Sequence, residues 1–566
     1  MNNWTFNGIE YRRPDMDAAI KAIQAHTQCI KNAKSGEEVI EAILAMSKES
    51  AEMEDMLSVA YIRNTLDTTD PFYEAEQAWM DQMMPTYTPY VIAFNNAVKE
   101  SPFRAAVEER FGKNYFIRME LSEKAFCEEN IPLMQKEAAL CTEYQKIMAT
   151  AKIELNGEVL NLFGVQKFFG DDDRSLREAA WKAYSKFYEE NEPRMEEIWQ
   201  ELITLRNHMG VNLGFENYIP VGYLEQGRSD YGMEQVANFR RQVREEIVPL
   251  CEKLYQAQAE RLGIDTLYAF DEKRLYPDGN AIPAGDDAFM VEEARKMYHD
   301  MSPETAEFID FMIGHQLMDL TNRPGKAATG YCAALPGRKA PFVFSCFNHT
   351  TADMNVLSHE LGHAFAAYRA LRAQELPEMQ NVTTDIAEIH SMSMEQFAQP
   401  YAEQFFGKDA DKFRFAHLQE AITFVPFAVC VDEFQHICYA HPELTPKERT
   451  YEWHKLEEIY MPWRKYKDDP FMERGGYWYH KIHIFLYPFY YITYALTTIG
   501  AMEFRKKAQE NRAEAWKDYL LLCDVGNRYT YLETLKMANV HVPFEDGAVA
   551  NAMVPVKETF AGFGIK

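Results

Sequence analysis

The sequence contains two histidines four residues apart, His359 and His363, with a glutamate, Glu360, directly after the first. In a helix, residues four apart project from the same face, one turn above each other. Two neutral imidazoles in this arrangement can hold one Zn²⁺ in a tetrahedral site. The adjacent glutamate can then act as general base toward a water on the metal. The segment therefore predicts a hydrolytic site with one zinc ion per chain.

The residues around this motif favour a buried helix. Leu357, Leu361, Ala364 and Phe365 form an apolar stripe beside the histidines, and no proline interrupts the segment. The alternative is a chance match on a surface helix. Few charged residues flank the motif, which argues against a solvated face. We therefore expect this helix to pack against other elements.

A catalytic zinc site needs a third protein ligand besides the two histidines. Residues 383–397 are periodic and open with Thr384 or Asp385 as a plausible N-cap, so they predict a second helix able to pack against the first. Periodicity alone does not choose the ligand from this helix. The candidates that remain open are Asp385, Glu388, His390 and Glu395.

Composition sets limits on the class of protein. The chain has 566 residues and is 47% hydrophobic, with 36 Phe and 32 Tyr, so it can bury a sizeable core and disorder is not expected. Its net charge of −28 opposes binding to nucleic acid or to anionic membranes. The nine cysteines include no C-x-x-C pair and are interpreted as reduced thiols.

The sequence also predicts where the protein resides. Its start has no basic segment followed by an apolar run, as a secretory signal would have. No stretch of about 18 uninterrupted apolar residues suggests a membrane span. We therefore expect a soluble cytoplasmic protein without nucleic-acid or membrane partners; the oligomeric state stays open.

Most of the chain has helical periodicity, and residue patterns typical of strands are confined to short segments. Residues 151–162 predict a hairpin around Asn156-Gly157, residues 340–347 a strand, and residues 325–337 a loop leading into that strand. The fold class expected is mainly α, with a small sheet beside the zinc-site helices. The acidic run at 171–173 is interpreted as a solvated loop and helix cap.

Domain boundaries are weakly marked. We expect an N-terminal helical subdomain over residues 1–190 and a catalytic domain over residues 191–566, with a soft boundary and possible continuity between the two.

The segment Ile-Ala-Glu-Ile-His-Ser-Met-Ser-Met-Glu at 386–395, at this distance from His359, resembles the second helix of the zinc oligopeptidases typified by oligoendopeptidase F and thimet oligopeptidase. The likeness extends to Tyr331-Cys332, residues 340–348, Asp353, the hairpin at Asn156-Gly157, Leu205-Arg206 and residues 213–218. It covers most of the chain from about residue 150 onward, and the shorter bacterial members, including Pz-peptidases, look closest.

The resemblance implies that Glu388 is the third zinc ligand and Glu360 the general base. One departure is His390, where relatives usually carry a small residue; it would place an extra imidazole near the metal. The family's fold implies a helical body that encloses a deep channel.

Residues 480–495 are rich in aromatic side chains, for which a buried aromatic helix is the structural alternative. In the family, a histidine and tyrosines from this region donate to the oxyanion of the intermediate. Tyr487, Tyr491 and Tyr494 have the spacing of one helical face, as in thimet oligopeptidase. Oligoendopeptidase F relatives instead carry a Phe-Tyr pair like Phe489-Tyr490 upstream of Tyr494. The residues assigned to this role are His483, Tyr494 and Tyr491.

The function implied is a cytoplasmic zinc endopeptidase that hydrolyses short, unstructured peptides. A peptide is expected to add to the strand at 342–347 by backbone hydrogen bonds. The residues expected to bind it are Phe344, Ser345, Cys346 and Phe347.

Two alternatives stay open. A dipeptidyl carboxypeptidase would need a cation to grip the free carboxylate of its substrate, for which Arg338 and Lys339 are candidates. A peptide-binding protein that has lost catalysis is less favoured, because the whole set of metal ligands and the base is intact.

Overall fold

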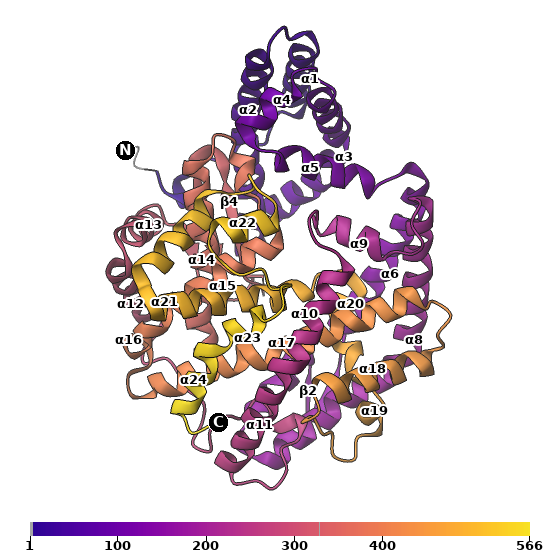
Figure 1. Cartoon of the computed structure of the whole chain (residues 1–566), viewed down its shortest axis with the longest axis vertical. Helices are drawn as coiled ribbons and strands as arrows, with labels where there is room; N and C mark the ends of the chain where they lie inside the picture. Colours follow the sequence, from indigo (N-terminus) through magenta and orange to yellow (C-terminus); the bar gives the residue numbers. More distant parts are fainter. Residues whose placement is uncertain (1–3, 328, 566) are drawn as a thin grey trace. The chain divides into compact units, whose positions relative to one another are not determined.

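The computed structural model describes residues 4–327 and 329–565, which are predominantly helical with two small sheets (Figure 1). The predicted fold class is confirmed. The chain forms two compact units, each built from three separate segments. Unit 1 comprises residues 1–120, 281–411 and 507–540; unit 2 comprises residues 121–280, 412–506 and 541–566.

Unit 1 begins with a layer of long helices whose starts are capped by side chains. Asp15 accepts a hydrogen bond from the Ala18 N–H, and Ser35 accepts one from the Glu38 N–H, as N-cap residues do. Their apolar stripes meet in one buried cluster. The helices of unit 1 are α1 (Met16–Asn32), α2 (Gly36–Leu66), α3 (Pro71–Lys99), α4 (Arg104–Phe111), α5 (Asn114–Lys124), α12 (Asp287–Met301), α13 (Pro303–Gly314), α14 (Thr351–Ala373), α15 (Thr384–Ala398), α16 (Ala402–Phe406) and α22 (Tyr531–Met537).

The sheet of unit 1 has three strands in the order β3-β5-β4, where β3 is Met318–Asp319, β4 is Tyr331–Leu335 and β5 is Ala340–Phe344. Strand β5 is central, parallel to β3 and antiparallel to β4. Its position agrees with the strand predicted at 340–347. The loop predicted over 325–337 is wrong in part, because it contains β4, a five-residue strand between Gly330 and Pro336.

Unit 2 consists of helices and one hairpin. Strands β1 (Ile153–Leu155) and β2 (Glu158–Leu160) pair antiparallel, and Asn156 and Gly157 both have positive φ, as the predicted tight turn requires. The helices are α6 (Ile131–Ala149), α7 (Leu162–Gln166), α8 (Arg174–Asn212), α9 (Ile219–Glu225), α10 (Met233–Glu246), α11 (Val248–Leu262), α18 (Pro446–Tyr460), α19 (Pro470–Glu473), α20 (Ile482–Leu486), α23 (Ala548–Ala552) and α24 (Val554–Gly562).

Helices α17 (Ala410–Ala440) and α21 (Ile492–Asp524) contribute residues to both units, and α5, which is mostly in unit 1, ends within unit 2. Helix α21 is broken at Asn511, whose backbone is not helical. Residue 190, where the sequence predicted a soft domain boundary, lies inside the uninterrupted helix α8. By length and composition alone, the segment 384–440 is apolar enough to cross a membrane. However, 61% of its most apolar 18-residue stretch is buried inside the protein, as in the core helix of a soluble protein.

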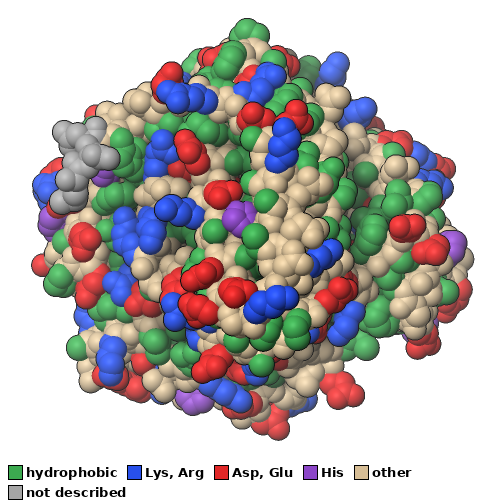
Figure 2. Space-filling view, turned by 90° about the horizontal axis from the view of Figure 1, so that it is seen from above, with side chains coloured by type: hydrophobic (Ala, Val, Ile, Leu, Met, Phe, Trp, Pro, Cys, Tyr) green, Lys and Arg blue, Asp and Glu red, His purple; other side chains and the backbone are tan. Residues whose placement is uncertain are grey.

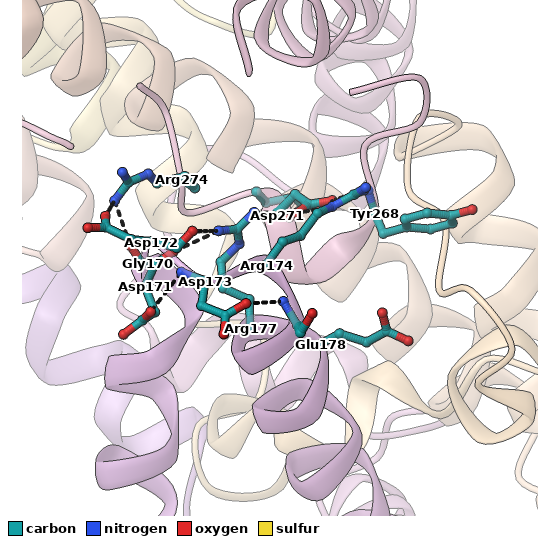
Figure 3. A network of polar contacts seen from close by, with 12 residues as sticks. Gly170, Asp171, Asp172, Asp173, Arg174, Arg177, Glu178, Tyr268, Asp271 and Arg274 are labelled. Atoms are coloured by element: carbon teal, nitrogen blue, oxygen red, sulfur yellow. Dashed lines mark hydrogen bonds and ion pairs between the residues drawn. The ribbon is translucent and has the colours of Figure 1, made fainter. Parts of the chain in front are cut away.

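The acidic run before α8 caps that helix and joins an ion-pair network in unit 2 (Figure 3). Asp173 accepts a hydrogen bond from the Ser175 N–H at 2.8 Å. Fully buried Asp271 binds Arg174 and Arg177 with N–O distances of 2.7 and 2.8 Å. In contrast, Asp172 is 86% exposed where it pairs with Arg274. The cap is as predicted, and Asp271 fixes the start of α8.

Acidic and basic side chains are interspersed on the face in Figure 2. This face therefore carries no large patch of one charge sign, although the net charge of the chain is −28. Mixed surfaces of this kind favour solubility without creating a strong field for polyanions or polycations.

Candidate metal centre

The two histidines lie on α14, as their spacing predicted. The helix begins after Thr350, whose hydroxyl accepts a hydrogen bond from the Ala352 N–H. The buried carboxylate of Asp353 accepts the N–H groups of Asn348 and His349 at 2.9 and 2.8 Å. These bonds fix the path of the chain from β5 into the helix.

Helix α15 brings a carboxylate to both imidazoles. Glu388 Oε2 lies 3.3 Å from His359 Nε2 and 3.7 Å from His363 Nε2. The candidate ligand atoms of the three residues all lie within 4.8 Å of one another. Among the residues that the structure describes, this is the only such group of histidine, cysteine and acidic side chains.

The spacing fits a tetrahedral zinc site. Bonds of about 2.0–2.2 Å at tetrahedral angles place neighbouring ligand atoms roughly 3.3–3.6 Å apart. The two measured distances from Glu388 match this range or exceed it slightly. Two imidazoles and one carboxylate are also the donor set of catalytic zinc, which keeps a fourth position open.

The other acidic residues proposed for α15 have different positions. Glu395 Oε1 lies 2.7 Å from His359 Nδ1, on the side of the ring opposite Glu388. It can therefore fix the tautomer and orientation of His359 without binding the metal. Asp385 is buried in the first turn of α15 and is outside the group of three.

His390 does not join the ligand group either. Its Nε2 lies 3.3 Å from the carbonyl oxygen of Leu522, and burial lowers its pKa to about 4. The extra imidazole expected near the metal is thus a buried side chain that contacts the backbone of α21.

The carboxylates affect the two histidines differently. Burial alone would lower the pKa of His359, but contact with Glu388 and Glu395 raises it above its ordinary value. Burial and the neighbouring charge of His359 lower the pKa of His363 to about 4. The negative charge of the site is therefore concentrated around His359, where a cation would be stabilised.

Gly362, between Glu360 and His363, lets the two helices approach closely. A Cβ atom on this glycine would lie 2.8 Å from Ser391 Cα and 2.9 Å from Met394 Cβ on α15. Any side chain here would push α15 away and carry Glu388 with it. Sequence reasoning did not predict this role, because the contact is between segments almost 30 residues apart.

Glu360 faces the sheet side of α14. A Cβ atom on Gly330, just before β4, would lie 3.8 Å from Glu360 Oε1. Burial raises the pKa of Glu360, and Glu388 and Glu395 raise it further against the effect of His359. A carboxylate with a raised pKa is suited to accepting and returning a proton.

The strand expected to bind a peptide, β5, does not lie at an edge of the sheet. Strand β5 is central, so both of its edges are already paired. Beyond it, the N–H groups of Ser345 and Phe347 donate to the carbonyls of Asp319 and Leu320 at 3.0 and 2.8 Å. Backbone addition of a peptide to β5 itself is therefore disfavoured, and substrate binding by Phe344, Ser345, Cys346 and Phe347 stays a prediction.

Strand β4 is one of the two outer strands of the sheet. The Val343 N–H donates to Leu317, so Val343 turns its backbone toward β3 and forms a non-hydrogen-bonded pair with Cys332. By alternation, Cys332 and Ala334 direct their N–H and C=O groups away from β5. No backbone hydrogen bond from these two N–H groups occurs within the described part of the chain.

Comparison with known proteins identifies the family. Residues 168–280 and 290–553 match the sequence model of "Peptidase family M3", and residues 6–126 match that of "Peptidase M3 N-terminal domain". This chain belongs to peptidase family M3. It is accordingly a metallo-oligopeptidase.

Solved structures and a curated protein similar to this chain support this assignment. The structure described as Pz peptidase A with inhibitor 2 has a TM-score of 0.89 and 40% identity, covering 98% of this chain and 99% of that one. An oligoendopeptidase F homolog of Borreliella burgdorferi is 20% identical over 82% of this chain and 78% of its own length. Oligoendopeptidase-F from Enterococcus faecium shares the fold, with a TM-score of 0.58, 15% identity and coverage of 97% and 98%.

In unit 2 of this M3 peptidase, His483 lies among tyrosines. Its ring centroid is 4.7 Å from that of Tyr491, 5.7 Å from that of Tyr490 and 6.5 Å from that of Tyr494. His483 Nδ1 is buried without a hydrogen-bond partner. Burial, with the charge of Lys481, lowers the pKa of His483 to about 3, so the imidazole is neutral near pH 7.

The tyrosines do not share one helical face. Helix α20 ends at Leu486, Phe489 has a φ of 58°, and α21 begins only at Ile492. The thimet-like spacing of Tyr487, Tyr491 and Tyr494 is therefore not a helical repeat. Instead, the hydroxyls of Tyr490 and Tyr494 lie 3.2 Å apart. Tyr490, which sequence reasoning did not select, is a further candidate donor.

The hydroxyl of Tyr491 is already engaged, since it accepts a hydrogen bond from Lys481 Nζ at 2.7 Å. Burial lowers the pKa of Lys481 to about 8. A lysine in this position holds the Tyr491 ring in one orientation.

Proposed function

We propose that this M3 peptidase is a zinc endopeptidase that hydrolyses short, unstructured peptides. The observation that carries the proposal is the convergence of His359, His363 and Glu388 with ligand-atom distances that suit zinc. Glu360 extends from the same helix beside this group. One zinc ion per chain is expected.

The three ligands would hold the ion, which when bound supplies a Lewis acid that acidifies water and polarises a carbonyl. Glu360 accepts the proton of the attacking water and returns it to the leaving amine. Glu395 holds His359 by its Nδ1 atom, so that Nε2 stays directed at Glu388. Gly362 keeps the two helices close enough for that arrangement.

The substrate would pair with β4 in place of β5. The outward N–H and C=O groups of Cys332 and Ala334 offer an extended peptide two pairing positions. Strand β4 begins next to Gly330, which is close to Glu360, so a peptide on this edge has its backbone near the base. Backbone pairing tolerates many side chains, as an oligopeptidase requires.

His483 and Tyr494 are proposed as donors to the oxyanion, with Tyr490 preferred to Tyr491 as the second tyrosine. Neutral His483 can donate one N–H, and the paired hydroxyls of Tyr490 and Tyr494 can supply another donor. Tyr491 is less suited, because its hydroxyl binds Lys481.

The exopeptidase alternative has weaker support. Arg338 forms an ion pair with buried Asp55, and Lys339 follows it in the turn between β4 and β5. This turn is at the opposite end of β4 from Gly330. A cation for a terminal carboxylate would need to lie two residues beyond the cleaved bond.

A cytoplasmic location and peptide substrates as the only partners are part of the same proposal.

One assay tests the proposal. Peptides of roughly 5–20 residues, blocked at both termini, should be cleaved internally by the zinc-loaded protein, and folded proteins should stay intact. Strict dependence on a free carboxylate would favour the dipeptidyl carboxypeptidase. Zinc binding without turnover on any peptide would favour the non-catalytic alternative.

A further inference from the structure

Unit 1 contains a cavity of about 370 Å³ that is separate from the metal centre. It lies among α1, α2, α3 and α5 and is closed on one side by η6 (Pro377–Gln380), the short helix between α14 and α15. Well-packed protein cores leave few voids larger than a water molecule. A space of this size within the helical layer is in the range of small-molecule sites.

The walls of the cavity are mainly apolar. Ile43, Met46, Tyr87, Phe94 and Met379 line it and are all less than a tenth exposed. Methionine side chains adapt their shape to different ligands, and aromatic rings supply a large contact area at low cost in conformational entropy. The cavity therefore suits a compact apolar group.

Two carboxylates, Glu54 of α2 and Glu378 of η6, converge on the same space. The Ser47 hydroxyl donates to Glu378 Oε2 at 2.8 Å, which directs this carboxylate toward α2. Burial and the charge of Glu378 raise the pKa of Glu54 to about 7. No ion pair among the described residues includes either carboxylate.

The one cationic side chain of the lining, Arg118 of α5, binds a backbone carbonyl of the lining and neither of the two carboxylates. Its guanidinium donates to the backbone carbonyl of Asn381, and burial lowers its pKa. Partly buried Glu54 and exposed Glu378 thus lie at a cavity with apolar walls, and neither has a cationic partner among the described residues. A positive charge carried on an apolar body would complement both the carboxylates and these walls.

We propose that this cavity is a binding site for a small apolar ammonium compound, with the ammonium group between Glu54 and Glu378 and the apolar body among the methionine and aromatic side chains. A simple arylalkylamine and the free N-terminal residue of a peptide share this chemistry. The site is independent of the zinc-dependent function proposed above.

The test is calorimetric titration of the zinc-loaded protein with 2-phenylethylamine and, as a neutral match, 2-phenylethanol. The amine should bind with one site per chain, and the alcohol at least tenfold more weakly. Glu54→Gln should weaken amine binding at least tenfold. Glu52→Gln, two residues away on the exposed side of α2, is the matched control and should leave binding unchanged.

Affinity for the amine should rise between pH 6 and pH 8, because Glu54 loses its proton in that range and gains the charge that binds the ligand. Titration with phenylalanine amide distinguishes a peptide N-terminus from a simple arylalkylamine as the ligand. If phenylalanine amide binds more tightly than 2-phenylethylamine, the site is assigned to peptide N-termini. If it binds more weakly, the site is assigned to simple amines.

Three results would overturn the proposal. The first is equal affinity for the amine and the alcohol. The second is amine binding that survives Glu54→Gln but is lost in His359→Ala, since it would occur at the metal centre. The third is no heat of binding with either compound, which would indicate a cavity occupied only by water. Circular dichroism of Glu54→Gln verifies that the variant is folded.

Discussion

The Cα atom of Ser391 lies 2.8 Å from the position that a Cβ atom on Gly362 would occupy. A backbone atom cannot turn aside as a flexible side chain can, so helices α14 and α15 touch at this point. The distance between the histidines and Glu388 therefore depends on residue 362 having no side chain.

Gly362→Ala should weaken zinc binding at least tenfold and lower the stability by about 1–3 kcal/mol, the usual cost of overpacking. Zinc retention against graded chelator concentrations and the melting temperature measure the two effects. Gly314→Ala at the end of α13 is the control, because a Cβ atom there meets nothing within 4 Å. Equal zinc retention in both variants would show that α15 tolerates the shift.

Replacing the base separates chemistry from binding. Glu360→Gln keeps the shape of the side chain and should retain one zinc ion, while turnover falls by roughly 10²–10⁴ because no group accepts the proton. Metal analysis and single-turnover kinetics on a blocked peptide measure these quantities. Near-normal turnover would show that water is activated by another group.

The two glutamates of α15 should differ in effect. Glu388→Ala removes a ligand atom and should abolish stoichiometric zinc. Glu395→Ala removes the partner of His359 Nδ1 and should lower metal affinity or activity by about 10–100-fold. This variant should still bind zinc. The contrary pattern, in which only the Glu395 variant loses its zinc, would exchange the two roles.

The outer edge of β4 can be tested with one proline. Ala334→Pro removes an N–H group that points away from β5, so the sheet pairing is kept and edge prolines are tolerated. The variant should bind zinc normally but show a higher KM, or lower kcat/KM, for extended peptides. Unchanged kinetics would mean that the substrate does not pair at this position.

Stability of unit 2 should depend on Asp271. Asp271→Asn leaves the buried guanidinium of Arg177 without its counter-charge and should cost about 3–5 kcal/mol. Asp172→Asn, which alters an exposed pair with Arg274, should cost about 0–1 kcal/mol. Urea unfolding of both variants measures the difference; equal midpoints would contradict the argument.

Features encoded over short distances were predictable from the sequence. His359 and His363 are fixed by one turn of helix, and Asn156-Gly157 specifies its hairpin by the positive φ values of the turn. The mainly helical class follows from periodicity over most of the chain.

Features that depend on distant pairing were not predictable. Strand β4 is short, lies between Gly330 and Pro336, and is recognised only by its pairing with β5. The central position of β5 in turn depends on β3, some 20 residues earlier. Periodicity left four candidates for the third ligand because the relative rotation of α14 and α15 is set at Gly362. The orientation of His390 depends on Leu522, 132 residues away.

The length of β4 has a consequence for the behaviour of the protein in a crowded cell. A strand that binds peptides must keep one edge unpaired, and unpaired edges invite other copies of the chain to add on. Strand β4 has five residues, with Gly330 before it and Pro336 after it. Two outward pairing positions would suffice for a flexible peptide but provide too few backbone hydrogen bonds for a second rigid sheet. The shortness of β4 thus protects the enzyme from polymerising along the strand that we propose as its substrate-binding edge.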